Sequence, residues 1–220
     1  MNECNFYTPE GVKPLYGEIV PAYQVAFSGE PWNEVSKCAD ENLRCTGGLS
    51  SLAIGATCEV CGNCPERPAY EADELTDAFD ALGSTRPTAW YIEQNENGVT
   101  LAVIAWKATA DVIAQEKYNG NSEMSEWMTR KFGNDEIMWL DEVFANKSLK
   151  SKGNLQNFGK FVTGLADILN TETIAYRTIE PRMLVAPRRD FDQDSSIFER
   201  QEDNPDRRDF VVINMGRENQ

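Results

Sequence analysis

The sequence contains no histidine, and this absence excludes several kinds of chemistry. Hydrolases built on a Ser-His-Asp or a Cys-His arrangement need an imidazole base, so both classes are excluded. Histidine is also missing as a metal ligand. A proton acceptor in this protein therefore has to be a carboxylate, a lysine, a tyrosine, a cysteine or a bound water.

Long hydrophobic runs are missing as well. No apolar stretch reaches the length of about 20 residues that a transmembrane helix needs, so we expect no membrane span and no membrane partner. The first residues, Met1-Asn2-Glu3-Cys4, show neither the basic region nor the apolar core of a secretory signal. The sequence therefore predicts a cytoplasmic protein, and its 220 residues suffice for one domain with an insertion.

Basic residues are scarce relative to acidic ones. The chain has 21 lysines and arginines against 36 aspartates and glutamates, which gives a formal net charge of −15. Such a field repels nucleic acid and attracts cations, including amines. We therefore expect no nucleic-acid partner. A simpler alternative is that the acidity only keeps the protein soluble.

Hydrophobic periodicity predicts alternating helices and strands. Helices are expected at 15–27, 70–82, 108–118, 123–132 and 155–169, and strands at 88–94, 99–106, 136–144, 173–179 and 210–215. Asn95-Glu96-Asn97-Gly98 separates the first two strands and is typical of a hairpin turn. After Ile179 only a short helix between Pro181 and Pro187 is possible, and 188–208 is expected to be irregular. This order predicts an α/β or α+β domain around one sheet.

A strand, a basic loop and a helix start follow one another over residues 140–155. The first amides of a helix have no partner within the helix, and together with the helix dipole they form an anion site suited to a pyrophosphate. Lys147, Lys150 and Lys152 add positive charge in an otherwise acidic protein. The alternative is a solvated loop that happens to carry three lysines.

This segment resembles the GNAT superfamily of acetyl-CoA-dependent N-acyltransferases. The family signature is a strand similar to E-L-F-V, followed by a loop Q/R-x-x-G-x-G/A that opens a helix. Glu142-Val143-Phe144-Ala145 resembles the strand, and Lys150-Ser151-Lys152-Gly153-Asn154-Leu155 resembles the loop. Lys150 replaces the usual arginine or glutamine, and Leu155 replaces the final small residue. The order of the predicted elements over 15–27 and 70–215 also fits.

The resemblance implies one GNAT-like domain over residues 1–220, with a mixed central sheet flanked by helices. It implies that acetyl-CoA binds with its pyrophosphate on the loop and its pantetheine along the strand edge. The implied cosubstrate-binding residues are Val143, Phe144, Ala145, Lys150, Ser151, Lys152, Gly153, Asn154 and Leu155.

Two residues are candidates for catalysis. Glu142 is the candidate base, acting directly or through a water, and the alternative is a solvated carboxylate at a strand end. Asp141, its neighbour, is expected on the opposite face of the strand. Because the general acid is usually a tyrosine in this family, the resemblance makes Tyr176 the candidate for protonating the leaving thiolate. Aromatic residues on the predicted strands line an acceptor cleft or belong to the core: Trp90, Tyr91, Trp106 and Trp139.

Residues 38–68 form a cysteine-rich insertion. Cys58-x2-Cys61-x2-Cys64 with Gly62 after Cys61 resembles half of a zinc knuckle, and structural zinc takes four ligands. The candidate zinc ligands are Cys38, Cys45, Cys58, Cys61 and Cys64, and the spacing does not select four of them. Cys4 stands apart as a free thiol. An iron–sulfur cluster, reduced cysteines or disulfides are the alternatives.

The sequence thus favours an N-acetyltransferase that moves an acetyl group from acetyl-CoA to an amine, cationic in character. The alternative is a zinc-stabilised binding or regulatory module on a degenerate GNAT fold without catalysis. A nucleic-acid-binding zinc protein is disfavoured by the net charge of −15. A homodimer is compatible with the sequence, which does not define the oligomeric state.

Overall fold

The structure is a computed structural model of the chain. It describes residues 3–29, 32–40, 45, 48–118, 121–145, 155–178, 181–191, 195–198 and 209–215. The basic loop predicted at 147–154 lies outside the described residues. Within the described ranges, no helix combines the length and the hydrophobicity needed to cross a membrane.

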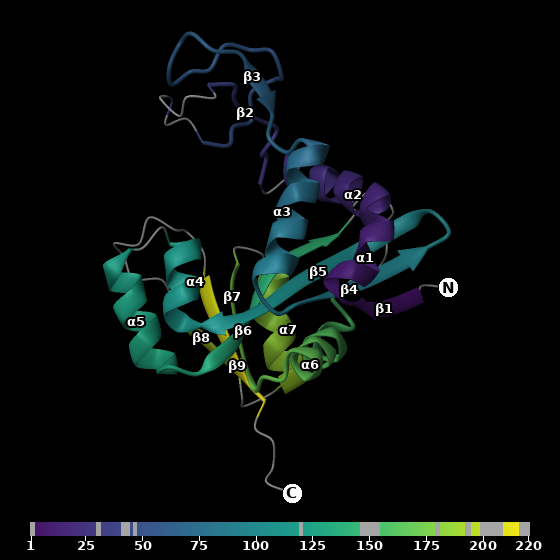
Figure 1. The fold of residues 1–220 in the computed structure, drawn as a ribbon, viewed down its shortest axis with the longest axis vertical. Helices are drawn as coiled ribbons and strands as arrows, with labels where there is room; N and C mark the ends of the chain where they lie inside the picture. Colours follow the sequence, from purple (N-terminus) through teal and green to yellow (C-terminus); the bar gives the residue numbers. More distant parts are fainter. Residues whose placement is uncertain are drawn as a thin grey trace, which may run out of the picture.

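A seven-stranded mixed sheet forms the centre of the molecule (Figure 1), in the order β1-β4-β5-β6-β7-β9-β8. Its strands are β1 (Glu3–Tyr7), β4 (Thr88–Asn95), β5 (Gly98–Thr109), β6 (Glu136–Ala145), β7 (Thr173–Thr178), β8 (Ser195–Phe198) and β9 (Asp209–Asn214). All neighbouring strands are antiparallel except β6 and β7, which are parallel. Among the described strands, the only parallel pair therefore lies in the interior of the sheet.

Helices cover both faces of this sheet. They are α1 (Pro9–Val12), the 3-10 turn η1 (Lys13–Leu15), α2 (Tyr16–Ser28), α3 (Ala72–Thr85), α4 (Ala110–Lys117), α5 (Ser122–Phe132), α6 (Phe158–Leu169) and α7 (Pro181–Phe191). On one face, α2 and α3 pack on Trp90 and Phe144, and α4 and α5 pack on Trp106 and Trp139. On the other face, α6 packs on Tyr91.

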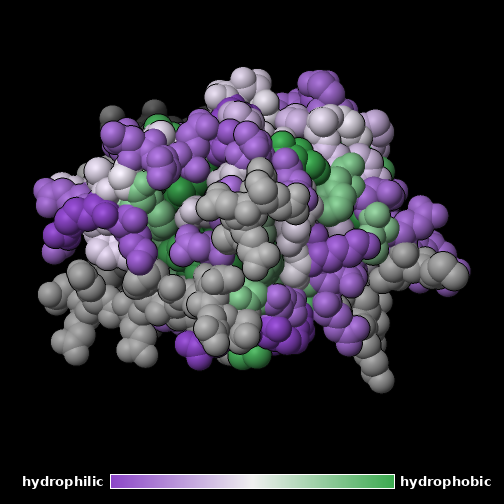
Figure 2. All heavy atoms as spheres, turned by 90° about the horizontal axis from the view of Figure 1, so that it is seen from below, coloured by the Kyte–Doolittle hydropathy of each residue, from purple (hydrophilic) through white to green (hydrophobic). Residues whose placement is uncertain are grey.

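The cysteine-rich insertion forms a small module that projects from the body beyond α3 (Figure 1). Its two short strands, β2 (Ser36–Cys38) and β3 (Glu66–Pro68), pair antiparallel. Ion pairs of Lys37 with Glu74 and of Arg67 with Glu71 and Glu74 fasten the module to α3. Figure 2 shows the opposite end of the molecule, where hydrophilic side chains cover most of the described surface and hydrophobic atoms show between them.

The predicted fold class, one mixed sheet flanked by helices, is confirmed. The hairpin is also present, with Asn95 paired to Gly98 and Gly98 at a φ of 109°, which favours glycine. Six described elements were not predicted: β1, α1, η1, β2, β3 and β8. Helix α7 is longer than the short helix that the sequence allowed between Pro181 and Pro187. Helix α7 contains Pro187 in its interior, a signal that normally ends a helix. Helix α6 begins at Phe158, three residues later than expected.

Candidate active site and cysteine cluster

Strands β6 and β7 separate soon after they meet. Their register contains only the pairs Met138 with Ile174 and Trp139 with Ala175. Strand β6 continues to Ala145 and stays paired with β5 on its other edge. Along the described part of the chain, the edge of β6 that faces β7 has no strand partner over residues 140–145. Such an edge offers backbone N–H and C=O groups to an extended ligand.

A β-bulge sits at the point where the two strands part. Two consecutive residues of β5 lie opposite Leu140 and Glu142, which leaves Asp141 as an extra residue in β6. Leu140 and Val143 both pack into the cluster on the α6 side of the sheet. Asp141 and Glu142 therefore both lie on the other face, towards α2 and α4. The expectation that they point to opposite faces is wrong, because the bulge interrupts the alternation.

The carboxylate of Asp141 is held by two donors. The indole Nε1 of Trp139 donates to its Oδ1 at 3.1 Å, and the ammonium of Lys117 forms an ion pair with the same oxygen. The side chains of Asp141 and Lys117 are only 11% and 22% exposed, so water screens this pair weakly. The Lys117 nitrogen also lies over the Trp106 ring, 5.8 Å from its centroid.

The neighbouring carboxylate, Glu142, is half-buried and lies near Tyr23 of α2. Burial first, and then the negative charge of Glu142, raise the pKa of Tyr23 above its usual range. Tyr23 packs edge-on against Phe144, with the ring centroids 5.0 Å apart. Glu142 thus lies beside a phenol that stays protonated at neutral pH.

Two further cations, Arg86 and Arg177, lie close to Trp106 and Lys117. The guanidinium of Arg86 lies over Trp106 at 4.4 Å from its centroid and pairs with Glu116. Arg177 donates to the carbonyl of Lys117 at 3.0 Å. The indole N–H of Trp106 is buried and has no hydrogen-bond partner among the described residues. A polar atom in that state is suited to a water or a ligand oxygen.

Tyr176 lies on the α6 side of the sheet, away from both carboxylates. Its side chain is 1% exposed, and its hydroxyl donates to the carbonyl of Met183 at 2.6 Å. Burial raises the pKa of Tyr176 above its usual range. The structure therefore does not bring Tyr176 together with Glu142.

Among the candidate cosubstrate residues, the structure describes Val143, Phe144, Ala145 and Leu155. Val143 and Ala145 pack towards α6, whereas Phe144 is buried against α2. Leu155 packs its side chain against the α6-side cluster, and its carbonyl accepts a hydrogen bond from Arg189 at 2.7 Å. The remaining candidates lie outside the described residues: Lys150, Ser151, Lys152, Gly153 and Asn154.

The first turn of α6 meets a carboxylate from α7. The backbone N–H of Gly159 donates to Oδ2 of Asp190 at 2.7 Å, and Arg189 pairs with the same side chain. The bond from Arg189, and then that from Gly159, lower the pKa of Asp190 below its usual range. One amide at the start of α6 is therefore already bound to an internal anion.

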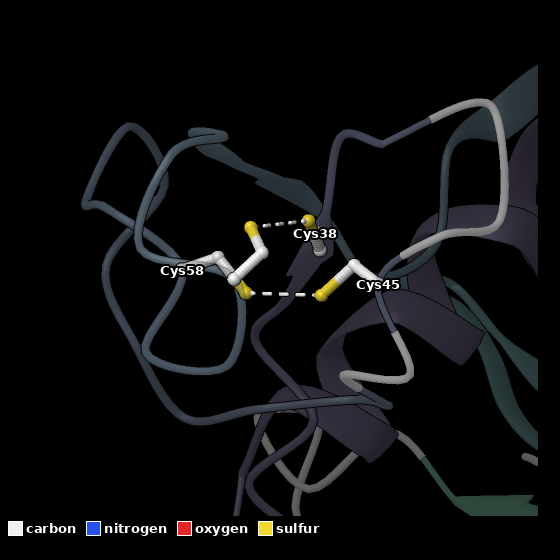
Figure 3. Close-up of side chains that lie close together, drawn as sticks. Cys38, Cys45 and Cys58 are labelled. Carbon is white, nitrogen blue, oxygen red and sulfur yellow. Dashed lines mark hydrogen bonds between the residues drawn. The ribbon is translucent and has the colours of Figure 1, made fainter.

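In the projecting module, four of the five candidate cysteines converge (Figure 3). Their sulfur atoms lie within 4.8 Å of one another, with 3.8 Å between Cys38 and Cys61 and 3.5 Å between Cys45 and Cys58. Zinc–sulfur bonds of about 2.3 Å in a tetrahedron place the sulfurs about 3.8 Å apart. The donor set and its spacing therefore fit one zinc ion.

Cys64, the fifth candidate, lies beside this cluster. Its backbone N–H donates to the sulfur of Cys61 at 3.5 Å. The N–H groups of Asn63 and Cys64 lower the pKa of Cys61 to about 6. A hydrogen bond between the Cys64 thiol and Cys61 raises the pKa of Cys64 to about 12. The two N–H groups favour the thiolate of Cys61, which is the form that metals bind, and the sulfur of Cys61 is the one that lies in the cluster. Gly62, at a φ of 66°, makes the turn between Cys61 and Cys64.

Comparisons with known proteins identify the fold. No family profile matches the sequence, and no curated protein sequence does. A mosquito arylalkylamine N-acetyltransferase like 5b matches with a TM-score of 0.57 at 7% identity, over 96% of this chain and 99% of that one. Arylalkylamine N-acetyltransferase 2 of Aedes aegypti matches with a TM-score of 0.54 at 11% identity, over 97% of this chain and 100% of that one. The Drosophila melanogaster polyamine N-acetyltransferase matches with a TM-score of 0.52 at 10% identity, over 97% of this chain and 98% of that one.

These structures share one mixed α/β fold. The chain has the fold of the GNAT N-acetyltransferases, as the strand-and-loop motif predicts. The similarity extends over nearly the whole length of the chain, although the sequences have diverged to about a tenth identity.

Three groups at the site were missed by sequence reasoning: Lys117, Arg86 and Tyr23. Lys117 at the end of α4 pairs with Asp141, Tyr23 of α2 lies near Glu142, and Arg86, the residue after α3, lies over Trp106. All three lie at least 19 residues before β6 in the sequence. No local motif marks them.

Proposed function

We propose that the protein is an N-acetyltransferase that moves the acetyl group of acetyl-CoA to an amine. One observation carries this proposal: the open edge of β6 begins at a bulge that places two carboxylates on one face. An extended cosubstrate along that edge has its reactive end beside groups that accept protons. Positioning and proton transfer are the two requirements of acyl transfer to an amine.

The direction of β6 orients the cosubstrate. The strand leads from the bulge at Asp141 to Ala145 and then into the basic loop, where the motif assigns the pyrophosphate to Lys150, Ser151, Lys152, Gly153 and Asn154. Pantetheine then runs back along residues 143–145. Its thioester arrives at Asp141 and Glu142, on the acceptor side of the sheet.

The chain's own residues supply the proton chemistry. Asp141 binds the acceptor ammonium, and Glu142 takes its proton directly or through a water, which leaves a neutral amine. The nitrogen attacks the thioester carbonyl, the carbon–sulfur bond breaks, and the CoA thiolate takes a proton from solvent. Backbone N–H groups of the open edge stabilise the developing oxyanion. Tyr176 has no part in this mechanism, because its proton is bound to Met183 on the other face.

The acceptor in this proposal is a cationic primary amine. Two carboxylates lie at the acceptor end, aromatic rings surround them, and the net charge of −15 attracts cations. The structural neighbours are named as arylalkylamine and polyamine N-acetyltransferases, which is consistent with this class of acceptor.

A zinc ion in this proposal is structural. Cys38, Cys45, Cys58 and Cys61 would hold it and would complete a four-sulfur shell, which leaves no open position for a substrate. The site lies in the projecting module rather than at the bulge, so its role is to hold residues 38–68 in one shape.

Titration calorimetry with acetyl-CoA, followed by an assay of thiol release with a panel of amines, tests the proposal. We expect binding, and turnover that prefers cationic amines and weakens as ionic strength rises. Absence of acetyl-CoA binding would overturn the transferase assignment. Binding without turnover on any amine would favour a regulatory module on the same fold.

A further inference from the structure

The most unusual contact at the bulge involves a lysine of the chain itself. The ammonium of Lys117 is bound to Asp141, the residue to which we assign the acceptor ammonium, and it lies over Trp106. We propose that Lys117 is itself an acetyl acceptor, modified by the active centre of its own chain. This inference rests on the proposed acetyl transfer.

The position of Lys117 matches that of an acceptor. It is the last residue of α4 and reaches the acceptor face of β6 at the bulge, where the open edge begins. A thioester carried along residues 143–145 ends beside the same bulge. Glu142 is the next residue after Asp141, the ion-pair partner of Lys117, and its side chain lies on the same face of the sheet as that pair.

The surroundings of Lys117 are those of a bound amine rather than of a solvated surface lysine. Its side chain is 22% exposed, its charge faces an 11% exposed carboxylate, and an aromatic face lies below it. The carbonyl of Lys117 also accepts a hydrogen bond from Arg177, which fixes the end of α4. A carboxylate combined with an aromatic face is a common way to bind ammonium groups.

Lys107 provides a matched comparison within the chain. It is also an ion-paired lysine of low exposure, 16%, bound to Glu136 at 3.0 Å. It lies opposite Met138, before the open edge of β6 begins. Lys107 therefore shares the burial and the pairing of Lys117 but not its position at the bulge.

The transfer is an ordinary aminolysis. The ammonium of Lys117 loses one proton to Glu142, its nitrogen bonds to the acetyl carbon, and the carbon–sulfur bond of the thioester breaks. The products are an Nζ-acetyl amide and CoA thiol, with one net proton released to solvent. The amide has no charge, so it no longer pairs with Asp141, and that carboxylate becomes available to an external ammonium.

The experiment uses the full-length protein with acetyl-CoA and no added amine, and measures acetylation at each lysine by peptide mass spectrometry over time. We expect Lys117 to gain one acetyl group about tenfold faster than Lys107, because its nitrogen is held at the thioester. The rate per molecule should not depend on protein concentration, since the transfer occurs within one chain. Glu142→Gln should slow modification of Lys117 and leave Lys107 unchanged.

A second measurement separates this inference from the proposed function. If the protein transfers acetyl groups to added amines while Lys117 is modified no faster than Lys107, the inference fails and the transferase assignment stands. If acetyl-CoA does not bind, both fail. Lys117→Arg should abolish the site and Lys107→Arg should not, and a lower KM for amines after preincubation with acetyl-CoA would support the release of Asp141.

Discussion

Asp141 and Glu142 are consecutive residues of one strand, yet both side chains lie on the same face of the sheet. Leu140 before them and Val143 after them both pack on the opposite face. In a strand without a bulge, successive side chains point to opposite faces, so the two carboxylates would lie on opposite faces of the sheet. Here they lie side by side, where Asp141 is bound to Trp139 and Lys117 and Glu142 faces Tyr23.

This arrangement predicts different effects for the two carboxylates. Glu142→Gln should lower kcat by about 10²- to 10⁴-fold and keep acetyl-CoA affinity, because the amide cannot take a proton. Asp141→Asn should mainly raise KM for cationic amines. Steady-state kinetics and calorimetry measure both effects.

The matched control is Glu136→Gln, at the exposed first position of the same strand. This change should leave kcat within about twofold, as expected of a surface substitution. Equal losses of kcat for Glu136→Gln and Glu142→Gln would show that the effect comes from charge on the strand and not from a base at the bulge.

The converging cysteines predict a specific pattern of metal loss. Purified protein should contain about one zinc per chain, and Cys58→Ser should remove it because one of four ligands is lost. Cys64→Ser and Cys4→Ser should keep the metal. Elemental analysis of the four proteins checks this, and equal zinc loss in the Cys64 variant would contradict the assigned set of ligands.

Chelation should affect the module and spare the sheet. The seven-stranded sheet has its own apolar clusters, whereas residues 38–68 are held by short strands and by the cysteines. Hydrogen exchange after zinc removal should therefore speed up in the module alone. A loss of protection in β5 and β6 would show that the module supports the core.

At Gly164, the ring of Phe6 leaves no room for a larger side chain. A Cβ at this position of α6 would lie 2.2 Å from Cζ of Phe6, so Gly164→Ala should destabilise the protein by about 1–3 kcal/mol. Gly17→Ala is the matched control, since no atom lies within 4 Å of its Cβ, and it should change stability by less than about 1 kcal/mol. Urea unfolding measures both. A neutral Gly164→Ala would show that Phe6 moves freely.

The sequence predicted the parts of the fold that follow local patterns. The period of α6, the turn before Gly98 and the strand that ends at Ala145 are all encoded within a few residues. Strand β1 was missed because its five residues carry no clear alternation, and the bulge at Asp141 was missed because it exists only in the pairing with β5. The Lys117–Asp141 contact joins two elements whose approach depends on the whole sheet.

The last prediction concerns Asp190, which binds the first turn of α6. Its pKa is lowered in the folded protein, first by Arg189, so it adds stability at pH values above the usual aspartate range of about 3.9. That stability is lost as pH falls through the lowered folded value. Asp190→Asn should therefore cost about 1 kcal/mol at pH 7 and remove this part of the acid dependence below about pH 4.

The same variant should bind acetyl-CoA more tightly, by about threefold to tenfold, because an internal negative charge next to the expected pyrophosphate site disappears. Urea unfolding from pH 3 to 7 and calorimetry at pH 7 give the two readouts, and Asp167→Asn, on the exposed side of α6, is the control that should change neither. Lower stability with tighter binding would mean that Asp190 occupies the anion end of α6 when acetyl-CoA is absent. Lower stability with unchanged affinity would contradict that competition and would restrict Asp190 to joining α6 and α7.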